Sequence, residues 1–324
     1  MLVDQSPEDN CTQVQIDKQT EDPLAELHLS ANVERYARKA LSDNTWSAYD
    51  YDLAHYYDWG GIIPASPDMI ASYIASFAGE LAVSTLNRRL AAINKAHEMQ
   101  GHPSPTKNEA VRLVMRGIRR EHSTIQKQAA PLLRDDLIQI LNHMGDDAKS
   151  IRDTAILMLG FACALRRSEI TALNVEDIEF VTEGAIITIR KSKTDQDGRG
   201  RRISIPKGRG RYCPVQKVQF FLKHIQKTEG ALFTSIRKGG HIQDARLSHN
   251  AISNIVKDYA EKIGHEPANY SGHSLRAGFV TSAAMLGIPE WQIMKQSGHK
   301  SHATMMRYVR DARLFEDHPL EAML

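Results

Sequence analysis

Two basic side chains one helical turn apart form a candidate anion-binding pair in the carboxyl-terminal half of the chain. They are His273 and Arg276, in the segment SGHSLRAG. Ser271 is expected to cap the helix that begins there, which puts both side chains near a helix N-terminus. The free backbone N–H groups of such an end favour an anion. The alternative is a surface histidine and arginine at an ordinary helix start, and the pair alone does not decide between them.

A second group of charged residues lies where an apolar helix comes to the surface. The apolar run that ends at Leu165 is followed by Arg166 and Arg167, with Glu169 shortly after. An arginine and a glutamate three residues apart can form an intrahelical ion pair worth roughly 0.3 kcal/mol. The same arginine, at the surface end of a core helix, could also serve an anion site.

Three more residues have types that could do chemistry. Lys193 lies in a predicted β-hairpin, where a lysine often serves only to discourage aggregation of strand edges. His299 follows Gly298 in a turn, and Ser301 can cap the next helix, which carries Tyr308. A tyrosine on an amphipathic helix more often packs in a core or interface than acts as a nucleophile. None of the three is a functional assignment by itself.

The distribution of charge favours a polyanionic partner. The formal net charge is +2, but residues 1–30 carry −6, which leaves +8 for residues 31–324. Nine Lys or Arg side chains lie within residues 190–211. A second cluster contains Arg112, Arg116, Arg119 and Arg120. Two such clusters on a chain otherwise near neutrality indicate nucleic acid as the first candidate partner.

Composition excludes several classes of protein. The 324 residues suggest about two domains, and 42% hydrophobic with 25% charged residues is typical of globular proteins. Three cysteines without a C-x-x-C pair exclude a disulfide scaffold or zinc finger. The longest apolar run, 154–165, is too short to span a bilayer, and the first residues carry no secretory signal. We expect a soluble cytoplasmic protein, nucleoid-associated if bacterial or phage, without metal or cofactor.

Helical periodicity accounts for the first part of the chain. Residues 1–25 are acidic and without periodicity, so they are predicted to be a disordered tail. Residues 26–122 are predicted to form a helical domain, with helices at 26–40, 43–58, 67–79, 83–100 and 108–121. The polar segment 123–131, STIQKQAAP, is the predicted linker.

Residues 132–324 are predicted to form a second domain, also mainly helical. Two runs of branched residues, AIITIRKSK and RRISIP, flank the turn TDQDGRG and predict a β-hairpin that carries Lys193. Helices are expected at 133–143, 148–163, 167–173, 214–228, 248–263, 273–286, 289–297 and 301–311. The predicted fold class is mainly α with a small β-hairpin or sheet in the carboxyl-terminal domain.

Taken in order, these residues resemble the tyrosine recombinase, or phage integrase, family. The family's ordered set is Arg in LRRSE, Lys in a hairpin, H-x-x-R, a glycine followed by His or Trp, and Tyr nine residues later. The order and spacing of six residue types are far more specific than any single member. The segments LAVSTLNRRLAAINKAH and NEAVRLVMRGIRREH also resemble helices of Cre-like recombinases. The resemblance covers about residues 26–315 and implies a two-domain, C-shaped clamp on double-stranded DNA.

The resemblance implies a role for each member of the set. Tyr308 would attack a DNA phosphate to form a 3′-phosphotyrosyl bond, with His273 as base. Arg166 and Arg276 would clamp the non-bridging phosphate oxygens. Lys193 would protonate the leaving 5′-oxygen, and His299 would add a hydrogen bond to the phosphate.

Three of these assignments involve a choice. Arg166 is preferred to Arg167 because Glu169 then stands at the family's spacing, where Glu169 would orient Arg166 or His273. Lys193 is preferred to Lys191 because it immediately precedes the turn. The implied enzyme is a DNA strand transferase that works at inverted-repeat sites through a Holliday junction, without ATP or metal. It would act as a homotetramer, a dimer on each site, linked by its carboxyl-terminal tail.

DNA recognition would be divided between the two domains. Arg88, on the polar face of the helix 83–100, could reach guanine bidentately. Thr45 and Asn250 are weaker candidates for base contacts, and each of the three could instead be a solvated helix residue. Phosphate contacts are expected from Arg112, Arg116, Arg119, Arg120, Arg201 and Arg202.

Two other functions are compatible with parts of the sequence. A type IB topoisomerase would use the same chemistry without strand exchange, but the amino-terminal helices argue against it. A non-catalytic helix-turn-helix regulator could use the stretch 282–309, with Gly287 in its turn. That interpretation explains the basic clusters but leaves the ordered Arg, Lys, His, Arg, His and Tyr as coincidence.

Overall fold

The computed structural model describes residues 35–36, 38–122, 128–190, 200–208, 210–312 and 323. The chain divides into two compact units, residues 1–126 and 127–324. None of the helices in the described part of the chain is long and apolar enough to cross a membrane.

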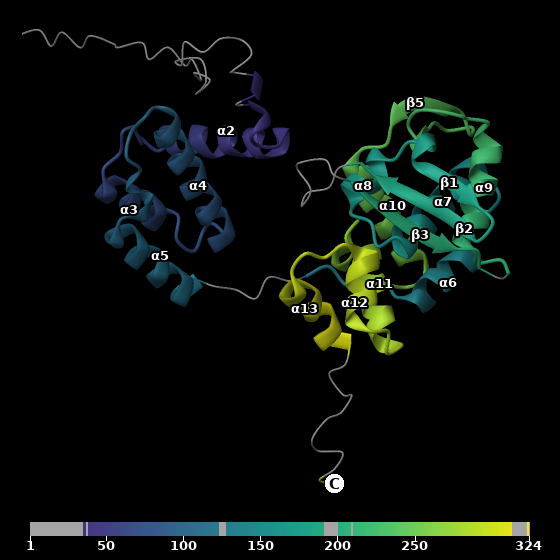
Figure 1. Cartoon of the computed structure of the whole chain (residues 1–324). Helices are drawn as coiled ribbons and strands as arrows, with labels where there is room; N and C mark the ends of the chain where they lie inside the picture. Colours follow the sequence, from purple (N-terminus) through teal and green to yellow (C-terminus); the bar gives the residue numbers. More distant parts are fainter. Residues whose placement is uncertain are drawn as a thin grey trace, which may run out of the picture. The chain divides into compact units, whose positions relative to one another are not determined.

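The first unit is built of helices, purple to blue in Figure 1. They are α2 (Asp43–Asp58), α3 (Pro67–Ser76), α4 (Val83–Met99) and α5 (Glu109–His122), with the short 3-10 turn η1 (Pro105–Lys107). Helix α2 packs on α4, and α3 packs on α5. These bounds agree with the four corresponding predicted helices to within three residues. The predicted helix 26–40 lies largely outside the described residues.

Local chemistry sets where these helices begin. Ser42 Oγ accepts the N–H of Thr45 at 3.3 Å, and Ser66 Oγ accepts the N–H of Met69 at 3.2 Å. Pro67 occupies the first helical position, where its missing N–H leaves no bond unmade. The apolar faces of the helices meet in a core that includes Tyr56, Tyr73, Ile70, Ile74, Leu86, Ile93 and Met115.

The described part of the second unit combines helices with two small antiparallel sheets, one of three strands and one of two (Figure 1). Its helices are α6 (Arg134–Asn142), α7 (Ala148–Ala162), α8 (Arg167–Ala172), α9 (Pro214–Ile225), α10 (His249–Lys262), α11 (Ser274–Met285), α12 (Glu290–Ser297) and α13 (His302–Ala312). Its 3-10 turns are η2 (Val175–Asp177) and η3 (Pro267–Asn269). Its strands are β1 (Ile178–Val181), β2 (Gly184–Ile189), β3 (Arg201–Pro206), β4 (Thr234–Ile236) and β5 (Ile242–Arg246). The prediction of a mainly helical fold with a small sheet is confirmed.

The main sheet has the order β1-β2-β3, with β2 and β3 forming the predicted hairpin. Ile189 pairs with Arg201, so residues 190–200 connect the two strands, and 191–199 lie outside the described residues. Strands β1, β4 and β5 were not predicted. They are short, and several of their residues are exposed, so the sequence there has no apolar alternation that would predict a strand.

Helix α11 lies at the centre of the unit and packs against α7, α12 and α13. Its Gly278 allows close packing, because a Cβ there would overlap the carbonyl oxygen of Leu132. Two backbone hydrogen bonds hold residues 130–132, where the chain enters the unit. Ala130 N–H donates to Asn269 O at 2.8 Å, and Leu132 N–H donates to Ser274 O at 3.0 Å. Ala130, near the end of the predicted linker 123–131, packs on the core of the second unit, and residues 123–127 lie outside the described residues.

Candidate active site

The turn after α7 places Arg166 at the start of α8. Ala164 has a left-handed backbone, φ +49°, and this reverses the chain. Glu169 then accepts the backbone N–H of Arg166 at 2.9 Å and its Nη1 at 2.7 Å. Arg167 is exposed, with Nη1 3.5 Å from Ser253 Oγ. Of the two neighbouring arginines, the geometry favours Arg166 as the inward one, and it pairs Glu169 with Arg166 rather than with His273.

Arg276 is the most deeply placed cation of the site, with 1% of its surface exposed. Its Nη1 donates to the carbonyl of Ala164 at 2.8 Å and to that of Ser297. Its Nη2 is buried and has no hydrogen-bond partner. Burial and the nearby Arg166 lower the pKa of Arg276 to about 10, so it stays a cation at neutral pH. A buried donor without a partner is costly, and an anion oxygen would satisfy it.

His273 and Tyr308 form a hydrogen bond between Nε2 and Oη, 2.8 Å apart. Burial raises the pKa of Tyr308, so the phenol is protonated at neutral pH. The ring of His273 is partly open to solvent, yet desolvation, followed by Arg276 and Arg166, lowers its pKa. A neutral imidazole therefore faces a protonated phenol, which is the arrangement that a general base requires.

The start of α11 differs from its prediction. The helix begins at Ser274, with His273 rather than Ser271 at the N-cap position. Ser271 Oγ still accepts the N–H of His273 at 3.1 Å. The serine thus orders the backbone of the histidine, one residue before the helix, instead of capping its first turn.

His299 lies in the turn between α12 and α13. Gly298 ends α12 with a left-handed φ of +66°, and Ser297 Oγ lies 2.7 Å from His299 Nδ1. The ring centres of His299 and Tyr308 are 6.2 Å apart. Burial, followed by Arg276 and Arg166, lowers the pKa of His299 to about 3, so this imidazole is neutral.

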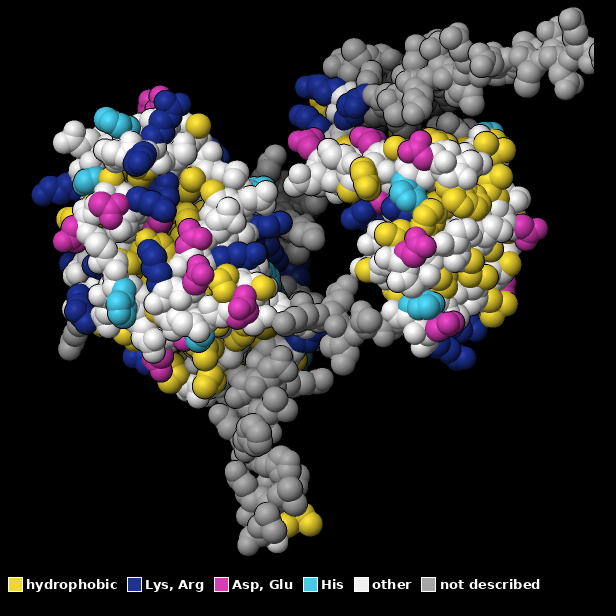
Figure 2. All heavy atoms as spheres, turned by 180° about the vertical axis from the view of Figure 1, so that it is seen from behind, with side chains coloured by type: hydrophobic (Ala, Val, Ile, Leu, Met, Phe, Trp, Pro, Cys, Tyr) yellow, Lys and Arg dark blue, Asp and Glu magenta, His cyan; other side chains and the backbone are white. Residues whose placement is uncertain are grey.

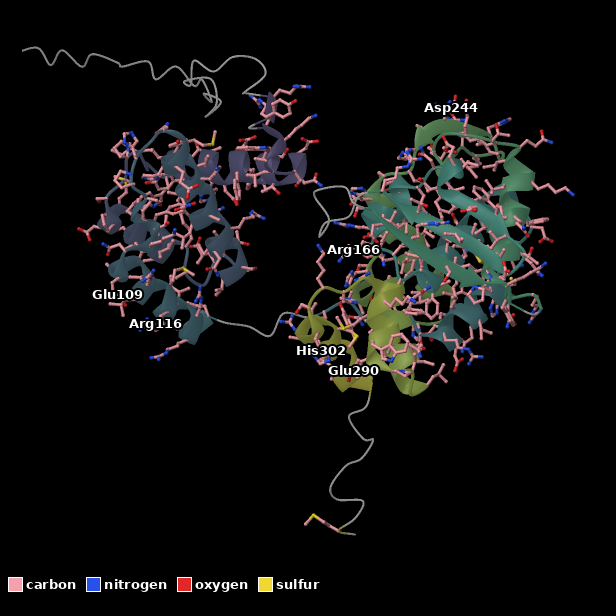
Figure 3. The ribbon with its side chains drawn as sticks, in the orientation of Figure 1. Glu109, Arg116, Arg166, Asp244, Glu290 and His302 are labelled. Carbon is pink, nitrogen blue, oxygen red and sulfur yellow. The ribbon has the colours of Figure 1, made fainter. Side chains whose placement is uncertain are left out.

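The structure thus brings together six of the seven predicted catalytic side chains. They are Arg166, Glu169, His273, Arg276, His299 and Tyr308, from α8, α11, α13 and the turn before α13. Figure 3 labels Arg166 near the centre of the view. The seventh, Lys193, lies outside the described residues.

Arg201 is not where the sequence suggested. It was expected to contact a DNA phosphate from the surface, but its side chain is 22% exposed and turns towards Glu169. Its Nη2 is 3.5 Å from Glu169 Oε2, and its Nη1 donates to Gln296 O at 3.0 Å. The reason is strand alternation: neighbouring residues of β3 point to opposite faces, so Arg201 and Arg202 cannot both face solvent.

The predicted base-reading residues of the first unit have partners inside the protein. Arg88 Nε and Nη2 donate to the two carboxylate oxygens of Asp52 at 2.7 and 2.9 Å. Its side chain is 47% exposed, but the Nε and Nη2 edge of its guanidinium is bound to the Asp52 carboxylate. The hydroxyl of Thr45 lies 2.8 Å from that of Ser42. Reading a guanine bidentately would require Arg88 to leave Asp52.

The arginines of α5 lie outside the stripe formed by its buried Val111, Met115 and Ile118. We call Arg112, Arg116, Arg119 and Arg120 the α5 arginines. The first two lie 3.8 Å from the carboxylate of Glu109, and Arg119 donates to Asn87 Oδ1 at 2.8 Å. Figure 3 labels Glu109 and Arg116 on this helix. All four are exposed, as a phosphate-contacting set requires.

Two predicted DNA contacts of the second unit are at its surface. Asn250 is exposed in the first turn of α10, and Arg202 is 63% exposed with Nη2 2.8 Å from Glu179. Figure 2 shows one face of this unit, on which basic and acidic side chains are interspersed.

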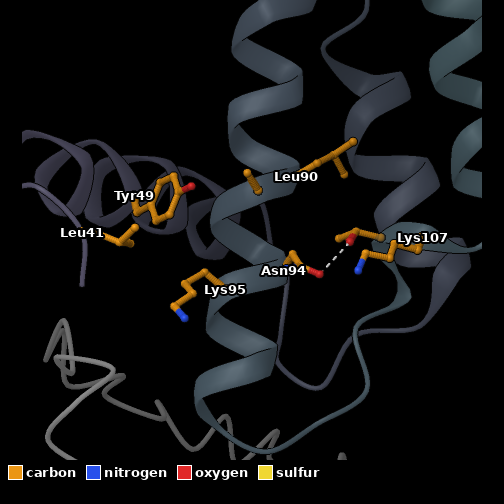
Figure 4. Close-up of a pocket in the computed structure, with 8 residues that line it drawn as sticks. Leu41, Tyr49, Leu90, Asn94, Lys95 and Lys107 are labelled. Carbon is orange, nitrogen blue, oxygen red and sulfur yellow. Dashed lines mark hydrogen bonds between the residues drawn. The ribbon is translucent and has the colours of Figure 1, made fainter. Parts of the chain in front are cut away.

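The first unit also contains a shallow hollow of about 320 Å³ between α2 and α4. Leu41, Tyr49 and Leu90 form its apolar part, and Lys95 and Lys107 lie on its rim (Figure 4). Asn94 Oδ1 accepts the hydroxyl of Thr106 at 3.3 Å across one side.

Sequence reasoning missed the residues that support the site. Ser297 holds His299 and Arg276, and Ala164 supplies a carbonyl to Arg276. Neither position has a type that points to chemistry. The only sequence signal was Gly298, which marks a helix end directly before the histidine.

The profile of the phage integrase family matches residues 131–314, which is more than half of the chain. An integrase/recombinase XerD homologue of Selenomonas ruminantium is 35% identical over 305 residues, covering 91% of this chain and 89% of its own. The chain belongs to the phage integrase family of tyrosine recombinases. It is therefore a DNA strand-transferring enzyme that acts in site-specific recombination.

Further comparisons support this membership. The Cre recombinase of Escherichia phage P1 is 28% identical over 314 residues, covering 86% of this chain and 90% of its own. A lambda integrase dimer bound to a core site has the same fold, with a TM-score of 0.60 at 15% identity, covering 86% of this chain and 94% of that one. A topoisomerase or a non-catalytic regulator is not favoured by these relatives.

Proposed function

We propose that this recombinase cleaves DNA with Tyr308 as its nucleophile. The observation that carries the proposal is the 2.8 Å contact of the Tyr308 hydroxyl with His273, beside Arg276. Oη would attack the phosphorus, and the bond from phosphorus to the 5′-oxygen would break. The products are a 3′-phosphotyrosyl bond and a free 5′-hydroxyl.

The proton balance assigns the remaining groups. The phenol proton passes to neutral His273, whose lowered pKa favours the unprotonated form before reaction. Arg166 and Arg276 bind the non-bridging oxygens, and the unpartnered Nη2 of Arg276 is a donor for one of them. His299 adds a further hydrogen bond, and Lys193 gives a proton to the leaving 5′-oxygen.

The phosphotyrosyl bond keeps the energy of the broken ester. A 5′-hydroxyl from a second strand can therefore reverse the attack and join strands without ATP or metal. Two such exchanges pass through a Holliday junction, and the sites are inverted repeats, each held by a dimer. Because its substrate is DNA, we propose that it works in the cytoplasm, at the nucleoid if it is a bacterial or phage protein.

The two units divide the work of DNA binding. Residues 26–122 form a core-binding domain, and residues 132–324 form the catalytic domain, joined by a linker so that both grip the duplex as a clamp. The α5 arginines and Arg202 contact phosphates. Arg88, Thr45 and Asn250 are the candidates for base contacts, with Arg88 exchanging Asp52 for a base edge.

The tail of each subunit links four subunits on paired sites. The tail residues Leu314, Phe315, Leu320 and Leu324 lie outside the described residues and are apolar. The second unit contains a groove of about 520 Å³, lined by Phe161, Phe279, Leu286, Ile288 and Trp291, among others. Leu286 and Trp291 are each 65% exposed, and an apolar tail from a neighbour would cover them.

Tyr308→Phe tests the proposal. The DNA probe is a duplex selected from a randomised library by covalent capture on the wild-type protein. Loss of one oxygen should abolish the denaturation-resistant protein–DNA adduct, because nothing else in the site replaces the nucleophile. Affinity measured by gel shift should stay near that of the wild type. An adduct formed by the Phe variant would contradict the assignment.

A further inference from the structure

Arg201 occupies a special point of the chain, where the strand leaving the hairpin turn enters the active site. It is the first residue of β3 and follows Gly200, whose φ of +68° turns the chain into the strand. Its neighbour Arg202 points to the opposite face and is 63% exposed. Of these two adjacent arginines, one is at the surface and the other, only 22% exposed, is turned inward.

The guanidinium of Arg201 joins two parts of the site. On one side, Nη2 lies 3.5 Å from Glu169 Oε2, and Oε1 of the same carboxylate holds Arg166. On the other side, Nη1 donates to Gln296 O at 3.0 Å, at the C-terminal end of α12. A cation is favoured there because the last carbonyls of a helix have no partner of their own.

The turn that carries His299 is built around this side chain. A Cβ at Gly298 would lie 2.5 Å from Nη1 and 2.8 Å from Cζ of Arg201, so any other residue there would displace the guanidinium from this position. Arg276 donates to the next carbonyl, that of Ser297. Two guanidiniums therefore donate to successive carbonyls, those of Gln296 and Ser297, just before Gly298 and His299.

A direct phosphate contact does not fit this geometry. Nη2 of Arg201 is buried, and it faces the Glu169 carboxylate at a distance too long for a hydrogen bond. Burial lowers the pKa of Arg201, while Glu169 acts in the opposite direction and keeps the cation paired. The charge of Arg201 is thus paired with Glu169 inside the protein.

We propose that Arg201 is a positioning residue for DNA cleavage, which fixes the spacing between Arg166, held through Glu169, and the His299 turn. The proposal rests on the proposed function, because it concerns the same phosphate site. Without Arg201, the α12–α13 turn and Glu169 would lose their common anchor. Arg166 and His299 would then meet the phosphate less often in the reactive arrangement.

The test compares Arg201→Met with Arg201→Lys and Arg202→Met on the captured duplex probe. Gel shift at several salt concentrations gives the affinity and its salt slope. Adduct formation with enzyme in excess over DNA, at saturation, gives the single-turnover cleavage rate. Arg202→Met supplies the signature of a lost phosphate contact, which is weaker binding with a salt slope shallower by about 0.9.

Arg201→Met should slow cleavage roughly 10- to 100-fold, as when a residue that orients a reacting group is lost. Its affinity and salt slope should stay near wild-type values. Arg201→Lys should recover part of the rate, because an ammonium can reach Gln296 O or Glu169 but not both. In the Glu169→Gln background, Arg201→Met should cost much less than in the wild type, because the two residues act through one contact.

Two results would overturn the proposal. One is a wild-type cleavage rate in Arg201→Met, and the other is the Arg202→Met signature of weaker binding with a shallower salt slope. If Arg201→Met does not fold, Arg201→Lys decides, since a wild-type rate there leaves no role for the two-sided contact. A wild-type protein that forms no adduct at all would instead refute the proposed function, and this inference with it.

Discussion

The α5 arginines and the arginines of the active site show two ways of placing positive charge. On α5 the guanidiniums are exposed, and three of the four lie near Glu109 or Asn87. In the second unit, Arg166 and Arg201 share a single carboxylate, Glu169, and Arg276 lies near them in a partly buried space. The first arrangement costs little because water solvates each charge.

The second arrangement is expensive without an anion. Burial and mutual repulsion lower the pKa values of Arg201 and Arg276, and each has a buried Nη2 without a hydrogen-bond partner. A phosphate would balance the charge of such a site and would satisfy the free donor of Arg276. We infer from this difference that surface arginines supply affinity for DNA, whereas buried arginines with an unsatisfied N–H donor mark where the reaction occurs.

The largest effect expected from this contrast is in Arg276→Lys. The variant keeps a positive charge but loses the fork that reaches two carbonyls and a phosphate oxygen. Its single-turnover cleavage rate should fall about 100- to 1,000-fold, the size of losing one preorganised donor to a transition state. Affinity by gel shift should change far less. A loss of affinity as large as the loss of rate would contradict the contrast, because Arg276 would then act in binding as the surface arginines do.

A smaller effect is expected in the pH dependence of stability. The folded-state pKa of His299 is about 3, below the ordinary value of 6.5. As pH falls below 6.5, the unfolded chain takes up a proton that the folded protein does not, so stability is lost towards acid. This should contribute about 1 to 2 kcal/mol between pH 7 and pH 5.

Denaturant unfolding of His299→Gln at the two pH values measures that contribution. The variant should lose less stability towards acid than the wild type, by the amount given above. His241→Gln, at an exposed turn position, is the control and should behave as the wild type. Equal acid losses in the wild type and His299→Gln would mean that burial and the arginines do not lower the pKa of this imidazole.

The smallest expected effect is on α5. Arg116→Gln should weaken DNA binding and make the slope of log affinity on log salt shallower by about 0.9, because one phosphate contact is lost. Glu109→Gln is the reciprocal change and should strengthen binding, since it frees Arg112 and Arg116 from their acid. Unchanged salt slopes in both variants would remove α5 from the DNA interface.

The sequence predicted the helices well because helical periodicity and caps are local signals. Ser42 and Ser66 cap the starts of α2 and α3 through hydrogen bonds to residues three positions later. Strand β1, with its exposed Glu179 and Phe180, had no alternation to reveal it. Its place in the sheet comes from pairing with β2, which no local pattern encodes.

The same distinction applies to the site. The ordered residue types identified Arg166, His273, Arg276, His299 and Tyr308, which the structure brings together. The partners of those residues were not predictable, because a backbone carbonyl such as that of Ala164 carries no sequence signature. Arg88 was assigned to DNA from its place on the polar face of the helix 83–100, and Arg201 from the basic cluster that contains it. Their pairing with Asp52 and Glu169 depends on contacts between distant segments.

The central claim is that Tyr308 becomes joined to the 3′ end of a cleaved strand. Mass spectrometry of the trapped adduct, after protease and nuclease digestion, tests it most directly. The modified peptide should contain Tyr308, with a nucleotide attached through its 3′-phosphate. A nucleotide on any other residue, or one joined through a 5′-phosphate, would contradict the account.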